Sequence, residues 1–145
     1  MTTTLLPRLD APVTNTPYTD AIALERKPVE VAAAREWLRK LLAEWFVPEA
    51  AADDALLMLS ETFTNSIIHA VGEESKATIT AALWERRLLI TVSDPDPVVY
   101  AGGLSDSGEH GRGLTIVEAL AVRFGTTPMP RGKIVFFELL TGGAS

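Results

Sequence analysis

The chain has 145 residues, 47% of them hydrophobic and 22% charged, which is the size and composition of one soluble globular domain. Its formal net charge of −6 argues against a nucleic-acid binder, because phosphate backbones are bound by clustered lysine and arginine. The absence of cysteine excludes disulfides and thiolate metal sites, and two histidines are too few for a multi-histidine site. No apolar run approaches the roughly 20 residues of a membrane span and no signal peptide is evident, so we expect a cytoplasmic protein without a membrane partner.

The amino-terminal segment differs in composition from the rest of the chain. Residues 1–20 are rich in threonine and proline and show no sustained period, which is typical of a flexible leader. We therefore expect a single folded domain at 21–145, beginning with a short strand at about 21–26.

Two helices are predicted next. Pro28 suits the first turn of a helix, and apolar residues then recur at three- and four-residue steps over 31–45. Pro48 begins the second helix, whose apolar residues follow the same spacing over 52–70. Both helices therefore present one apolar side to a core.

Beyond Gly72 the apolar period changes to two. Alternation over 77–84 and again over 88–94 predicts an antiparallel hairpin, and the segment 95–113 is rich in the proline, glycine, serine and aspartate of a long loop. A short helix and two strands are then expected, at 114–121, 122–127 and 133–140. This order of elements predicts an α+β sandwich with helices on one face of a sheet.

The second predicted helix contains an unusual polar segment, Ser60–Ser66, although serine, threonine and asparagine are mediocre helix formers. Within it and just beyond, Glu61, Asn65 and His69 are spaced four residues apart, so they lie on one side of the helix. A carboxylate and an amide one turn apart can bind hydrated Mg²⁺ or position a water. The alternative interpretation is a solvated polar stripe on an amphipathic helix.

Two further candidates come later in the chain. Asp94 ends a strand and continues its apolar row, where it could accept a hydrogen bond from a ligand amine, although aspartate is also common at strand ends. Gly111, Arg112 and Gly113 directly precede the helix expected from Leu114. Glycines allow close backbone approach, and the first N–H groups of a helix favour a bound phosphate.

Three motifs stand in a fixed order along the chain: Glu61-x-x-x-Asn65, a strand ending in Asp94, and Gly111-x-Gly113-Leu114. In this order they resemble the N box and the two glycine-containing boxes of the GHKL (Bergerat-fold) ATPases. The segments LMLSETFTNSIIHA, ITVSDPDP, GRGLTIVEALAVRFG and GKIVFFEL are similar to the stand-alone anti-sigma-factor serine/threonine kinases, over about residues 20–140. The resemblance implies a two-layer sandwich with a mixed, mostly antiparallel sheet.

The resemblance also implies roles for these residues, with ATP and Mg²⁺ as cofactors. Glu61 would be the general base that activates the attacking hydroxyl, Asn65 would hold Mg²⁺, and Asp94 would accept from the adenine amino group. The phosphates would be bound by Gly111, Arg112, Gly113 and Leu114. The implied partners are a sigma factor and a small STAS-type anti-sigma-factor antagonist, with a possible homodimer.

Two departures from the family pattern favour a second hypothesis. The family carries glycines at two positions shortly after this aspartate. In this chain Pro95 and Pro97 are adjacent to those two positions after Asp94, and proline stiffens the chain. Ile134 stands where a threonine often helps to bind adenine through water, and isoleucine cannot make that hydrogen bond. The alternative is therefore a degenerate adaptor that keeps the fold and the protein interface but binds nucleotide weakly or not at all.

Overall fold

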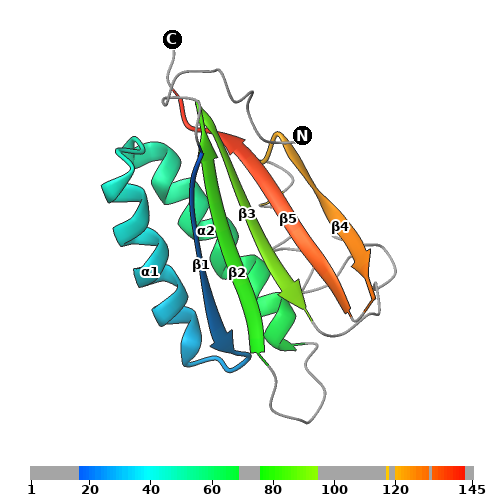
Figure 1. Cartoon of the computed structure of the whole chain (residues 1–145). Helices are drawn as coiled ribbons and strands as arrows, with labels where there is room; N and C mark the ends of the chain where they lie inside the picture. The colour runs from blue at the N-terminus through cyan, green and yellow to red at the C-terminus, as the bar shows by residue number, and fades with distance from the viewer. Residues whose placement is uncertain (1–16, 69–75, 95–116, 118–119, 131, 143–145) are drawn as a thin grey trace.

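A computed structural model describes residues 17–68, 76–94, 117, 120–130 and 132–142 (Figure 1). Its elements are β1 (Tyr18–Glu25), α1 (Glu30–Glu44), α2 (Glu49–Ile68), β2 (Lys76–Trp84), β3 (Arg87–Asp94), β4 (Arg123–Met129) and β5 (Gly132–Leu140). The five described strands form one sheet in the order β1-β2-β3-β5-β4, and both helices lie against one face of it (Figure 1). The predicted α+β sandwich is confirmed. The expected sheet was mixed and mostly antiparallel, and its described strand pairs are all antiparallel.

The first strand begins earlier than its sequence indicates. Tyr18, Thr19 and Asp20 pair with β2 in an unbroken register, so they belong to β1 and not to the leader expected at 1–20. All three side chains are exposed, so this end of the strand shows no apolar alternation to read in the sequence. Residues 1–16 of the expected leader lie outside the described part.

The hairpin and the two helices follow their predicted periods. Alternate residues of β2 and β3 are buried, and the turn between them is Glu85-Arg86, with Glu85 in the left-handed region at a φ of 59°. The buried side chains of α1 and α2 pack on the same face of the hairpin and form one core with it. Neither helix of the described chain is both long and apolar enough to span a membrane.

The last two strands complete the sheet. β5 lies between β3 and β4, so the residues of β5 that share the core face with β3 are Lys133, Val135, Phe137 and Leu139. The loop expected at 95–113 and most of the helix expected at 114–121 lie outside the described residues. Within that helix, Ala121 donates its N–H to the carbonyl of Val117 at 2.8 Å, which is the spacing of a helical turn.

Candidate functional site

The polar segment of α2 contains two serines with structural contacts. Ser60 accepts a hydrogen bond from Arg35 of α1 and donates to the carbonyl of Leu56 at 2.9 Å. Ser66 is buried, and its hydroxyl and carbonyl accept from Nε and Nη2 of Arg26 at 3.1 and 2.8 Å. These two serines tie α2 to its neighbours, which accounts for part of a sequence that is unfavourable in a helix.

Glu61 and Asn65 lie in the same segment, and their side chains are not hydrogen-bonded in this way to any residue that the structure describes. Both side chains are half-buried, and neither makes a hydrogen bond or an ion pair with the described part of the chain. Because they are four residues apart on α2, their side chains lie one turn from each other on one side of the helix. Their half-burial and shared side of the helix are compatible with a ligand site, and the solvated polar stripe of the alternative interpretation stays open.

Asp94 is buried at the end of β3, where its carboxylate forms ion pairs with two cationic side chains. Its Oδ1 lies 3.1 Å from Nη2 of Arg26, and its Oδ2 lies 3.4 Å from Nζ of Lys133. The three side chains are 3%, 4% and 8% exposed, in the order Asp94, Arg26 and Lys133. Ions removed from water to this extent require partners of opposite charge, so the cluster fixes the position of the carboxylate.

Arg26 joins the two parts of the predicted site. It contacts Ser66 on α2 and Asp94 on β3, so the polar segment of α2 lies at the end of the sheet where β3 ends. The structure thus brings the helix turn that carries Asn65 to the same region as Asp94. Sequence reasoning missed Arg26 because it lies far from Asp94 along the chain.

The β5 residue beside Asp94 is not the one expected. Lys133 is the register partner of Asp94, whereas Ile134 pairs with Ser93. Since successive side chains of a strand point to opposite faces, Ile134 lies on the face away from the helices and cannot stand beside Asp94. Lys133 takes that place and was missed, because the pairing register cannot be read from either strand alone.

The remaining predicted residues, Gly111, Arg112, Gly113 and Leu114, lie outside the described residues. Among the side chains that the structure describes, no group of three or more acids or histidines could hold a metal ion alone. Mg²⁺ takes oxygen ligands and keeps several waters, so one amide oxygen together with phosphate oxygens is a sufficient set. The amide oxygen of Asn65 is a ligand of the type that such an ion takes.

Comparison with protein families agrees with this fold. The model of the histidine kinase-like ATPase domain matches residues 24–138. The chain belongs to this family. The match in this histidine kinase-like ATPase extends from β1 to β5 and includes Glu61, Asn65 and Asp94. Membership indicates ATP binding, and ATPases of this superfamily generally use ATP with Mg²⁺. Among curated proteins, none matches the chain significantly.

Proposed function

We propose that this histidine kinase-like ATPase domain is an Mg-ATP-dependent serine/threonine kinase of the anti-sigma-factor type. Its substrate is a small STAS-type antagonist protein, and its alternative partner is a sigma factor, so that phosphorylation regulates transcription by partner switching. The observation that carries the proposal is the Glu61–Asn65 pair, which is half-buried and makes no hydrogen bond or ion pair with the described residues, in a chain of an ATP-binding family.

The proposed roles follow from the chemistry of each group. Phosphoryl transfer requires mainly positioning and charge neutralisation, which few side chains can supply. The Glu61 carboxylate accepts the proton of the attacking hydroxyl, and the Asn65 amide oxygen is a ligand for Mg²⁺. Asp94, fixed by its two cations, accepts from the adenine amino group. By resemblance, the phosphates are bound by Gly111, Arg112, Gly113 and Leu114.

A second candidate function has support from two observations. Both carboxylate oxygens of Asp94 are already in ion pairs, so an adenine amino group would have to share them with Arg26 and Lys133. The next residues along the chain include Pro95 and Pro97, which limit the conformations available there. A non-catalytic adaptor would keep the scaffold and its protein-binding surface and bind nucleotide weakly or not at all.

Thermal melting with Mg-ATP separates the two functions. A ligand at 100 times its Kd adds about 2.7 kcal/mol to the free energy of unfolding, which raises the Tm of a domain of this size by several degrees. We expect a magnesium-dependent rise in Tm that Asn65→Ala largely removes. Thr64→Ala, a truncation at the adjacent half-buried position, is the matched control and keeps the rise. If millimolar Mg-ATP leaves the Tm of the parent unchanged, the adaptor function is correct.

The role of Glu61 is tested by phosphate transfer. Glu61→Gln keeps the shape of the side chain but removes its basic carboxylate, so we expect nucleotide binding to persist. Transfer of the γ-phosphate from labelled ATP to a purified STAS-type antagonist should fall by about a hundredfold or more. Equal transfer rates in the parent and in Glu61→Gln would remove Glu61 as the general base.

A further inference from the structure

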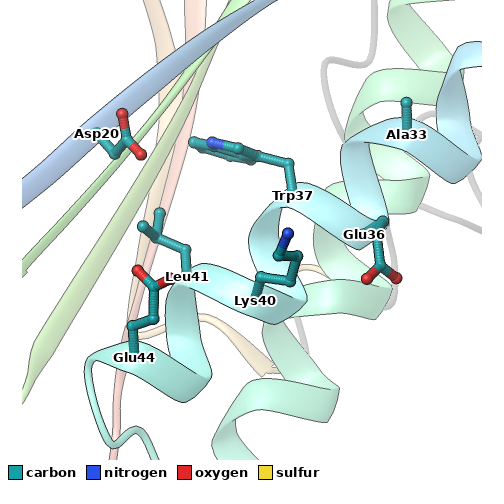
Figure 2. Close-up of a pocket in the computed structure, with 7 residues that line it drawn as sticks. All are labelled: Asp20, Ala33, Glu36, Trp37, Lys40, Leu41 and Glu44. Carbon is teal, nitrogen blue, oxygen red and sulfur yellow. The ribbon is translucent and has the colours of Figure 1, made fainter.

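A groove lies between α1 and the edge strand β1, and its lining includes neither Glu61 nor Asn65 nor Asp94 (Figure 2). It has a volume of about 420 Å³ and is lined by Asp20 of β1 and by Ala33, Glu36, Trp37, Lys40, Leu41 and Glu44 of α1. Figure 2 shows the Trp37 indole extending from the helix towards Asp20. The lining of α1 covers about 16 Å at 1.5 Å per residue, which is the length of about five residues of extended chain.

The groove is acidic, with an aromatic side chain among its acids. Asp20, Glu36 and Glu44 are opposed by a single cation of the lining, Lys40. Of these acids, Glu36 also pairs with Arg39, which lies outside the lining. The charged head of a lysine or arginine side chain could pair with these carboxylates. Its methylene stem could pack against the Trp37 ring.

The strand at the side of this groove is an edge strand of the described sheet. Among the described strands β1 pairs with β2 alone, in eight consecutive pairs without a bulge or a proline. The opposite edge strand, β4, carries Pro128, which cannot donate a hydrogen bond. An edge strand presents unpaired N–H and C=O groups to which another chain can add. β1 is therefore the edge that is suited to strand addition.

We propose that β1 and the groove together dock an extended, basic segment of a partner protein. The segment adds to the edge of β1 through its backbone, and alternate lysine or arginine side chains enter the groove between the acids and lie against Trp37. A second copy of this chain is a poor occupant, because the chain is acidic overall and would bring like charges together. This docking site is independent of nucleotide binding and of phosphate transfer.

The first test uses a fluorescein-labelled octapeptide in which lysine and valine alternate, with the full chain in solution. We expect saturable binding by fluorescence anisotropy that weakens as salt is added. Hydrogen exchange should become slower in β1 while β4, the matched edge, is unchanged. Equal binding of the corresponding glutamate–valine peptide, or slower exchange in β4 instead of β1, would overturn the proposal.

The second test reverses charge inside and outside the groove. The double variant Asp20→Lys and Glu44→Lys is expected to bind the lysine–valine peptide at least about tenfold more weakly. The control Asp53→Lys and Glu85→Lys makes the same change in net charge at exposed positions outside the groove, and should bind within about twofold of the parent. Circular dichroism and Tm verify that both variants are folded.

Two results of this comparison would overturn the proposal. One is equal binding of the peptide by the two double variants, which would mean that the groove charges do not recognise it. The other is a dimer of the parent in analytical ultracentrifugation that disappears in the groove variant and that the peptide does not displace. In that case a second copy of the chain is the occupant.

Discussion

Asp94 shows how a single side chain can be fixed by partners that the sequence does not place near it. Its carboxylate is removed from water and lies against Arg26 on one oxygen and Lys133 on the other. A buried ion pair adds little to stability beyond what burial of apolar groups would give, but loss of one member removes an opposite charge from the buried residues that remain. The cluster therefore makes Asp94 important for folding.

We expect Asp94→Ala to lower the free energy of unfolding by about 3–5 kcal/mol, because two buried cations lose their carboxylate. Urea denaturation with constant m-value measures this loss. Glu36→Ala removes the exposed ion pair with Arg39 and should cost about 0.5 kcal/mol or less. Similar losses in the two variants would show that the buried cluster does not carry this energy.

The residues of the site were predictable to different degrees. The burial of Asp94 follows from the alternation of its strand, and the placement of Glu61 and Asn65 on one side of α2 follows from their four-residue spacing. Arg26 and Lys133 could not be found in this way, because their contacts depend on how strands far apart in the sequence pair. Local patterns fix the face on which a side chain lies, whereas its partner depends on the register.

At the scale of elements, α2 combines a core face with a face that carries the candidate residues Glu61 and Asn65. Phe63 is fully buried against the sheet, whereas Leu57 on the same helix is 39% exposed. We expect Phe63→Ala to lower the free energy of unfolding by about 3–5 kcal/mol, because it removes buried apolar area and leaves a cavity. Leu57→Ala should cost about 1 kcal/mol or less. Urea denaturation of both variants compares the faces, and equal costs would contradict this assignment of the core.

Strand ends were harder to predict than helices and strand cores. Helix periods identified α1 and α2, and alternation identified β2 and β3. β4 was expected to end at Thr127, before Pro128, but the strand continues to Met129. Proline is tolerated there because β4 is an edge strand, which leaves half of its backbone groups without a ladder partner.

For the whole molecule, the order of the strands predicts an order of local stability. β3 lies inside the sheet and carries Leu88, Ile90 and Val92, all fully buried, whereas β1 and β4 are at the edges. We expect β3 amides to exchange hydrogen only through global unfolding, and amides of the two edge strands to exchange through smaller openings. Native-state hydrogen exchange at low urea measures the difference. Equal protection of β1 and β3 without a partner would contradict it.

The fold class was predictable because motif order and periodicity agree over most of the chain, and the family match at 24–138 covers the same span. The finer function is less accessible to this reasoning. One fold hosts many activities, and the choice among them depends on a few side chains and on the surfaces that meet partners. Here those surfaces include an edge strand and a groove, whose character comes from tertiary packing.

The position of β5 between β3 and β4 bears on how the protein is made on the ribosome. A nascent chain that has been synthesised only to residue 130 contains β4 but not the strand that β4 pairs with in the described sheet. During that interval β3 has a bare edge, which other nascent chains and chaperones can bind. Truncation before β5 should consequently give an aggregation-prone polypeptide and not a smaller working domain.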